Sequence, residues 1–431
     1  MKKNKDLQKL KKALMRSNTR LLLSAVMIFQ FAAGLLLALK KSPFDGQALI
    51  LAVALPLATW LVSTLVVRFW PVDRAIAIMA LLLCSVGILT LQDIARAAIT
   101  TQTQAQYAGL GIVAMFFGAF AIRGFRHWKA FTPYLMVLCL IALLSPWVLG
   151  GWKGGARNWV RIGSFSLQPS EFMKPVFILA LASGFSNRPR FMKCLPTLGF
   201  AAACCAILLS QRDLGALLLY FLTTVAMFFV ATSNGLVTLA GLGMGAGAAV
   251  IAYQSFEYVR DRVAIWQDPW VDPEKLGYQI VQALIAIGSG GLFGMGLGLG
   301  SPRNIPLYHS DFIFAALTEE FGLIFSVCVL VIYVLIIMRG MIAAMNARTS
   351  FHSLGAFGIV AMLGLQTMLI VGGNTKLLPL TGVTLPLISS GGSSLVSTFF
   401  AFGVLLGISS MNAQDEARDI EIIEMSEEAM L

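Results

Sequence analysis

Long apolar runs separated by short polar segments make up most of this chain. A helix needs about 20 apolar residues to cross a bilayer, with a range of about 17–25. Twelve runs meet or approach that length, at residues 21–39, 47–67, 75–92, 106–122, 131–149, 171–186, 195–210, 214–232, 236–254, 312–338, 355–371 and 393–410. The sixth and seventh are the shortest. None alternates between apolar and polar residues, so the runs are predicted to be helices whose backbone groups bond within each segment.

The composition agrees with this pattern. Of the 431 residues, 58% are hydrophobic and 12% are charged, whereas about one-quarter of the residues of an ordinary soluble domain are charged. The chain therefore has too few polar residues to cover the surface of a soluble protein. The expected fold is an all-α polytopic integral membrane protein with about twelve transmembrane helices.

The remaining charge is concentrated at the two ends of the chain. The first 20 residues contain eight bases, and the last 21 contain seven acids. Although the net charge is +11, the basic end is typical of a juxtamembrane segment that faces anionic lipid, and nucleic acid is not an expected partner. The first apolar run is too long for a signal peptide and is expected to remain as an anchor.

Lys and Arg also set the expected orientation, because they are enriched in cytoplasmic segments. A cytoplasmic N-terminus puts most of them inside, and an even number of spans then puts the C-terminus inside as well. The chain divides into a basic N-terminus (1–20), N-terminal and first core helices (21–92), a membrane core (93–410) with a large outer loop (255–311), and an acidic tail (411–431). Bases that remain in the later outer loops suggest an anionic partner there, such as a lipid pyrophosphate, with lipid headgroups as the alternative.

Ionisable residues inside membrane spans are costly and are functional candidates by default. Here they lie near the outer ends of three spans: Glu171 and Lys174, Arg212 and Asp213, and Asp311 with Glu319 and Glu320. Structural alternatives exist, since Asp213 and Asp311 could be helix N-caps and Glu171 and Lys174 could be a local ion pair. Taken together, these residues indicate one site on the outer half of the membrane.

Two glycine-rich polar segments are expected to border this site. Residues 286–300 contain seven glycines but lack the preceding strand and the G-K-[ST] motif of a phosphate-binding loop. A flexible loop with exposed amides that admits a bulky headgroup is favoured, and a re-entrant packing segment is the alternative. The second segment, 372–394, brings hydroxyls such as those of Ser393 and Ser394 to membrane depth, where irregular backbone lines a cavity. The charges and aromatics of 257–266 suit a helix at the interface.

Residue spacing gives no support for a metal site or a disulfide framework. The six cysteines form no C-x-x-C motif, and the three histidines are scattered. No metal ligands are therefore predicted.

At these residues the chain resembles the SEDS family of polytopic bacterial proteins, whose members include FtsW, RodA and SpoVE. The matching motifs follow one another over about 155–394. They are G-A-R-N-W (155–159), Q-P-S-E with a following lysine (168–174), Q-R-D-L-G (211–215), G-Y-Q (277–279), H-S-D-F (309–312), the paired glutamates (319–320) and S-S-G-G-S-S (389–394). Arg212 stands where the family usually has proline, and Lys376 where it usually has glycine. The family usually has three spans before G-A-R-x-W, whereas five are expected here, so the first two are interpreted as an addition to a ten-helix core.

The resemblance implies a peptidoglycan glycosyltransferase that polymerises lipid II at the outer face of the bacterial cytoplasmic membrane, in cell division or cell-shape elongation. It implies lipid II, the growing glycan strand, membrane lipids and a class B penicillin-binding protein as partners. The family's essential loop aspartate falls on Asp311. Other family motif residues fall on Trp159, Glu171, Lys174 and Asp213.

The hypothesised reaction is an inverting glycosyl transfer with Asp311 as general base. Partial desolvation at the water–lipid boundary would raise the basicity of this carboxylate. Arg157, Lys174 and Arg212 could stabilise the departing pyrophosphate, although Lys174 could equally just hold Glu171. No soluble cofactor is needed. The sequence does not decide whether a divalent cation, Mg²⁺ or Mn²⁺, takes part.

A lipid II flippase is the alternative from another functional class, because it also needs a lipid-open cavity with buried charge. Transport should require a polar path toward the inside, yet the loop at 233–235 is short and the motifs lie outside. This favours the polymerase. A third hypothesis, a scaffold of the division or elongation machinery, would leave Asp311 dispensable for synthesis.

Overall fold

The computed structural model describes residues 2–40, 45–94, 98–124, 128–153, 155–163, 165–186 and 191–429. In these residues the long helices are α1 (Lys2–Lys40), α2 (Gly46–Phe69), α3 (Arg74–Ile94), α4 (Ala98–Gly124), α5 (Trp128–Leu149), α6 (Pro169–Gly184), α7 (Phe191–Ser210), α8 (Leu214–Thr232), α9 (Gly235–Ser255), α12 (Ile313–Met345), α13 (Ser350–Asn374) and α14 (Gly392–Ala429). The outer loop contains α10 (Glu257–Gln267), α11 (Tyr278–Gly290) and the short 3₁₀ helix η1 (Pro302–Asn304).

Every predicted span falls on one of the long helices. Eleven helices in the described part of the chain are long and apolar enough to cross a membrane. The remaining one, α6, has 16 residues and so extends only about 24 Å at 1.5 Å per residue. The prediction of a multi-pass helical membrane protein is confirmed, with eleven candidate spans rather than the expected twelve.

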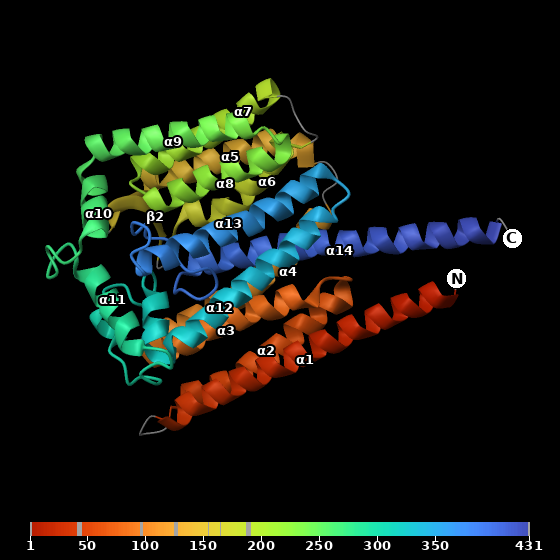
Figure 1. The fold of residues 1–431 in the computed structure, drawn as a ribbon, viewed down its shortest axis with the longest axis horizontal. Helices are drawn as coiled ribbons and strands as arrows, with labels where there is room; N and C mark the ends of the chain where they lie inside the picture. The colour runs from red at the N-terminus through yellow and green to blue at the C-terminus, as the bar shows by residue number, and fades with distance from the viewer. Residues whose placement is uncertain are drawn as a thin grey trace.

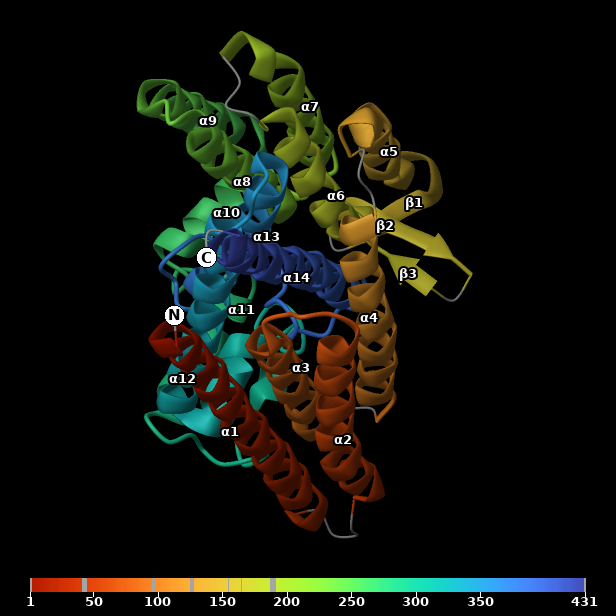
Figure 2. The same ribbon diagram turned by 90° about the vertical axis from the view of Figure 1, so that its right-hand side faces the viewer.

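The helices run side by side, and both termini lie at one end of the bundle (Figure 1). The small sheet, α10 and α11 lie at the opposite end (Figure 1). In the end view, α13 and α14 lie between one group made of α1 to α4 and another made of α5 to α9 (Figure 2). The segment between α13 and α14 is therefore at the centre of the bundle and at the end away from the termini.

Burial separates central from peripheral helices. In α3, 94% of the apolar window is buried, whereas none of the corresponding window of α9 is. Most residues of the short helix α6 are also buried. Because lipid tails are as apolar as leucine side chains, hydrophobicity alone does not choose which helices are central. Polar contacts between helices therefore contribute to that choice.

A three-stranded antiparallel sheet between α5 and α6 was not predicted. Its strands β1 (Gly150–Lys153), β2 (Ala156–Ile162) and β3 (Phe165–Leu167) pair in that order. The turns contain Gly155 (φ 80°) and Gly163 (φ 62°), a left-handed backbone that favours glycine. The strands are shorter than a membrane span, so the hydropathy pattern that reveals the helices does not reveal them.

A break inside α12 determines how the outer loop packs. Gly322 has φ 86° and ψ 169°, which interrupts the helix within its membrane span. Such a break frees backbone N–H and C=O groups, and lipid offers them no hydrogen-bond partner. Residues 291–296 supply the partners. These backbone bonds run from Met295 N to Glu319 O (2.8 Å), from Gly296 N to Glu320 O (3.0 Å), from Leu323 N to Gly291 O (2.9 Å) and from Ile324 N to Leu292 O (3.2 Å).

This packing corrects the expectation of a flexible loop with exposed amides. Residues 278–290 are helical, and residues 291–301, here called the glycine loop, form the re-entrant packing segment that was the alternative. Glycine is needed where the two backbones meet. A Cβ at Gly294 (φ 83°) would lie 2.2 Å from Glu320 O, and one at Gly322 would lie 2.4 Å from Gly294 N.

Replacing Gly294 with alanine should destabilise the protein, because the methyl group meets the α12 backbone. The left-handed φ costs about 1–2 kcal/mol for a residue with a side chain, and overpacking costs about 1–3 kcal/mol. Gly288→Ala is the matched control, since a Cβ at this position in α11 has no neighbour within 4 Å. Thermal unfolding in detergent should show a lower Tm for Gly294→Ala only. An equal Tm for both variants would contradict the close packing of the glycine loop.

Candidate active site

Asp213 lies at the start of α8 and joins three elements through its carboxylate. One oxygen, Oδ1, caps the helix by accepting from Ala216 N at 3.1 Å. The other, Oδ2, accepts from Asn158 Nδ2 (2.9 Å), Gln168 Nε2 (3.1 Å) and Ser170 Oγ (3.1 Å). Asp213 is only 8% exposed, and a buried carboxylate needs such donors. The N-cap considered from sequence is present, and the same side chain holds β2 and the start of α6 against α8.

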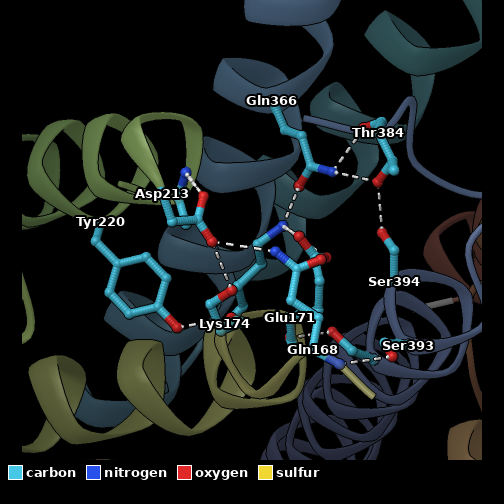
Figure 3. A network of polar contacts seen from close by, with 12 residues as sticks. Gln168, Glu171, Lys174, Asp213, Tyr220, Gln366, Thr384, Ser393 and Ser394 are labelled. Atoms are coloured by element: carbon cyan, nitrogen blue, oxygen red, sulfur yellow. Dashed lines mark hydrogen bonds and ion pairs between the residues drawn. The ribbon is translucent and has the colours of Figure 1, made fainter. Parts of the chain in front are cut away.

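Glu171 and Lys174 form a buried ion pair in the first turns of α6 (Figure 3). Lys174 Nζ lies 2.7 and 2.8 Å from the two carboxylate oxygens of Glu171, and 3.0 Å from Gln366 Oε1 in α13. These contacts use all three N–H donors of the ammonium group. Lys174 therefore holds Glu171 and joins α6 to α13.

The network continues from Gln366 to α14 (Figure 3). Gln366 Nε2 donates to Thr384 O at 2.7 Å, and the hydroxyls of Thr384 and Ser394 are 2.8 Å apart. Ser393 Oγ accepts from the backbone N of Gln168 at 3.1 Å. The two serines singled out from sequence are therefore part of the network at the start of α6.

A small cavity of about 40 Å³ lies beside Lys174 and Gln366. Its other polar lining residues are Ser397 and Thr398 of α14, and the rest of the wall is apolar. A volume of this size holds a few waters at most. The cavity can hydrate the ion pair, but it cannot hold a sugar.

Asp311 lies just before α12, at the end of the outer loop. Its backbone oxygen accepts from Asn374 Nδ2 at 2.8 Å, which ties it to the end of α13. A Cβ at Gly382 would lie 3.6 Å from Asp311 Oδ2, so the segment between α13 and α14 passes close to the carboxylate. The N-cap position of α12 belongs to Phe312, and no side chain caps that helix. The helix-cap alternative therefore does not apply to Asp311.

The surroundings of Asp311 change its acidity. The residue is partly buried, and desolvation raises the pKa of its carboxyl above the usual value. A hydrogen bond from Ser310 and the charge of Arg262 oppose this shift. The direction agrees with the sequence expectation of a more basic carboxylate.

Arg262 is the cation that links the two aspartates. It interacts electrostatically with both Asp213 and Asp311, and its Nη1 donates to Leu380 O at 2.9 Å. Trp266 of the same helix donates to Lys376 O at 3.2 Å. The helix expected at 257–266 is thus present as α10, and it is anchored on the segment between α13 and α14.

Arg157, Trp159 and Arg212 lie at the edge of the buried network. Arg157 donates from Nη2 to Trp147 O at 2.9 Å, and its guanidinium lies 4.9 Å from the centroid of the Trp147 ring. Trp159, in the same strand β2, is partly buried. Arg212 is exposed and lies 5.2 Å from the ring centroid of Tyr258 in α10. These three side chains are closer to solvent than the ion pair of α6.

Two departures from the family pattern coincide with left-handed backbone. Arg212 has φ 59° and Lys376 has φ 60°. Proline is fixed near −65°, so the turn before Asp213 cannot have this form in a chain with the usual Q-P-D-L-G motif. Glycine, in contrast, would adopt the conformation of Lys376 without strain.

Glu319 and Glu320 lie apart from this network, so the expectation that all buried charges form one site is wrong for them. Glu319 Oε1 accepts from Ser301 N at 2.8 Å, and Glu320 Oε2 accepts from Gly298 N. Both carboxylates therefore hold the glycine loop.

Several residues of the network were not predicted from the sequence to be site residues: Asn158, Gln168, Arg262, Gln366 and Thr384. Gln366 carried a usable signal, because a lone amide inside an apolar span calls for a partner. Arg262 did not stand out, since it is one of several charges in the helix 257–267.

Among the residues that the structure describes, no group of three or more His, Cys, Asp and Glu side chains is placed to hold a metal ion. We therefore assign no residues to the divalent cation that the sequence left open. All six cysteines are free thiols.

Known proteins resemble this chain over most of its length. The sequence model of the family described as "Cell cycle protein" (FtsW/RodA/SpoVE) matches residues 20–414. Stage V sporulation protein E of Bacillus subtilis is 35% identical, over 78% of this chain and 96% of that protein. The peptidoglycan glycosyltransferase RodA of Mycobacterium tuberculosis is 36% identical over 64% of this chain, which spans 62% of the length of that relative.

A solved structure of a peptidoglycan synthase complex, described as coordinating polymerization and crosslinking, contains a chain of the same fold. Its TM-score is 0.70 and its sequence identity 28%, over 80% of this chain and 99% of that chain. The family match includes Asp311, the network at α6 and α8, and the glycine loop. The chain therefore belongs to the SEDS (FtsW/RodA/SpoVE) family.

Proposed function

We propose that this protein is a peptidoglycan glycosyltransferase that polymerises lipid II into glycan strands at the outer face of the bacterial cytoplasmic membrane, in cell division or cell-shape elongation. The observation that carries the proposal is the setting of Asp311: a partly buried carboxylate with no capping role, beside Arg262. Two comparisons support it. The mycobacterial relative is named for this activity, and the similar solved chain comes from a peptidoglycan synthase complex.

The reaction joins two lipid-linked sugars. The 4-hydroxyl oxygen of the acceptor forms a bond to the anomeric carbon of the donor, as the bond from that carbon to the undecaprenyl pyrophosphate oxygen breaks. The hydroxyl proton passes to Asp311, and the pyrophosphate leaves with the bonding electron pair. A positioned base of this kind contributes about 10²–10⁴-fold in rate.

The remaining site residues divide into two groups. Arg157, Trp159 and Arg212 are partly or fully exposed, so we assign them to contacts with lipid II, with the two arginines stabilising the departing pyrophosphate. The buried residues, which are Glu171, Lys174, Asp213, Ser393 and Ser394, are assigned to positioning. For Lys174 this replaces direct contact with pyrophosphate, because all its donors are already used.

The membrane topology is also a proposal. We treat α6 as a twelfth, short transmembrane helix, because it is enclosed by its neighbours. The helices α1 and α2 are proposed to be an addition to a ten-helix core. The similarity to the solved chain extends over 99% of that chain but only 80% of this one, so this chain is the larger of the two.

The proposed orientation puts both termini in the cytoplasm and Asp311 outside. Both termini lie at the end of the bundle opposite α10 and α11, which supports this orientation (Figure 1). The eight bases at the N-terminus also support it, because Lys and Arg are enriched on the cytoplasmic side. The proposed partners are the growing glycan strand, membrane lipids and a class B penicillin-binding protein that crosslinks the strands. No nucleic acid or soluble cofactor is required.

Replacing Asp311 with asparagine should abolish polymerisation, because the amide cannot accept the hydroxyl proton. Loss of a general base lowers turnover by about 10²–10⁴-fold. The matched control is Asp268→Asn, an exposed aspartate of the same outer loop whose carboxylate accepts from the backbone N of Trp270. The assay supplies lipid II to the purified protein, with and without a class B penicillin-binding protein, and measures glycan polymer.

The same assay separates the competing functions. Undiminished polymer from Asp311→Asn would overturn the assignment of Asp311 as the general base. Absence of polymer from the wild-type protein, together with movement of lipid II across vesicle membranes, would favour the flippase.

Neutralising Arg262 should change the pH dependence of the reaction. The base form of Asp311 exists above its pKa, so activity is lost as the pH falls through that pKa. Because the charge of Arg262 lowers this pKa, Arg262→Gln should move the acid limb of kcat/KM to higher pH, whereas Arg262→Lys should leave it nearly in place. Initial rates measured across pH test this. An unshifted acid limb in Arg262→Gln would contradict the electrostatic coupling of Arg262 to the titrating base.

A further inference from the structure

The outer end of α1 reaches the glycine loop through Lys40. Lys40 Nζ lies 3.3 Å from Asp93 Oδ1 near the end of α3. The Asp93 side chain is 2% exposed and that of Lys40 is 30% exposed. A Cβ at Gly298 would lie 2.0 Å from Lys40 Nζ and 2.8 Å from Asp93 Oδ1, so the glycine loop passes directly beneath this ion pair.

Apolar contacts strengthen the same junction. Leu37 and Ala38 of α1 form a buried cluster with Ala48 of α2 and Leu89 of α3. Leu297 of the glycine loop packs against this cluster. The loop is therefore held by the helical hairpin α1–α2 through a side chain, in addition to the ion pair.

Buried polar contacts fix the hairpin on the core. Gln30 Nε2 in α1 donates to Thr59 Oγ1 in α2 at 2.9 Å and to Ser85 Oγ in α3 at 3.0 Å. At the outer end, Gln92 Nε2 of α3 donates to Asp45 Oδ2, just before α2, at 2.9 Å. Hydrogen bonds between helices stabilise their association inside a membrane. These contacts therefore hold the hairpin α1–α2 against α3.

The chain that leaves the glycine loop leads to Asp311. Ser301 N is held by Glu319 Oε1 at 2.8 Å, and Arg303 Nε donates to Ile94 O at 3.0 Å, one residue after Asp93. Ile305 is buried together with Phe312 in a second cluster. The end of α3 therefore contacts both Lys40 and the segment that leads to Asp311.

We propose that the hairpin α1–α2 is a brace for the glycine loop, and that Lys40 is a positioning residue for Asp311. Without the Lys40 charge, Asp93 keeps a buried carboxylate with no cation at its Oδ1. The glycine loop then loses its close contact with the Lys40 ammonium group at the end of α3, and the segment 301–311 becomes more mobile. The catalytic part of this inference rests on the proposed function, whereas the mechanical part does not.

Lys40→Met tests the brace, because it keeps the length and apolar stem of the side chain and removes the charge. In full-length protein, hydrogen exchange of 291–311 should become faster, with exchange in α5 to α8 unchanged. Polymerisation at saturating lipid II should fall about 10-fold, since a displacement of about 1 Å at a catalytic group can cost about 10²-fold. Lys40→Arg should retain both properties, and Arg20→Gln, which removes an exposed cation midway along α1, 20 residues before Lys40, should change neither.

A second variant keeps the test decisive if Lys40→Met is unstable. Lys40→Met with Asp93→Asn removes both charges, so it should regain thermal stability while exchange of 291–311 stays fast. Normal exchange of the loop in Lys40→Met would overturn the brace. A loosened loop with unchanged turnover would overturn the positioning role of Lys40. If the wild-type protein makes no polymer, the proposed function fails, and the exchange measurement still decides the brace.

Discussion

The absence of water inside the bilayer is the constraint on which this structure depends, because each backbone group and each charge there needs a partner within the protein. The break in α12 illustrates it. Gly322 frees backbone groups inside a membrane span, and the glycine loop satisfies them through paired hydrogen bonds. The loop is thereby inserted into the bundle, and the chain that continues from it brings Asp311 to the start of α12.

The same constraint explains why polar side chains join the helices. Apolar faces gain little by leaving lipid for one another, whereas a buried carboxylate or ammonium group is stable only when its donors and acceptors are matched. Asp213 and Lys174 are both fully engaged, and their partners come from β2, α6, α8 and α13. These residues order the core around the segment 380–384, which passes beside Asp311. On the proposed function, the motif residues Asp213, Glu171 and Lys174 of this chain serve mainly to position Asp311.

Much of this arrangement could be predicted from the sequence. Apolar run length identified the helices because lipid imposes both length and hydrophobicity on a span. The scarcity of charge made Asp213, Glu171, Lys174 and Asp311 conspicuous. The small sheet was not predicted, because its strands are too short to show a clear alternation of apolar and polar residues. The role of Glu319 and Glu320 was not predicted, because it depends on a backbone break at Gly322. A glycine in an apolar run does not by itself indicate that a helix is broken there. Arg262 lies 49 residues before Asp311 in the chain, so only the fold could bring the two together.

The protein is proposed to polymerise lipid II at the face of the membrane where Asp311 lies. Proteoliposomes with one orientation of the protein and labelled lipid II confined to a single leaflet test it most directly. Glycan polymer is expected when lipid II is in the leaflet beside α10, α11 and Asp311, without transfer of label to the other leaflet. Transfer of label without polymer, or polymer only from lipid II in the leaflet at the end of the two termini, would contradict it.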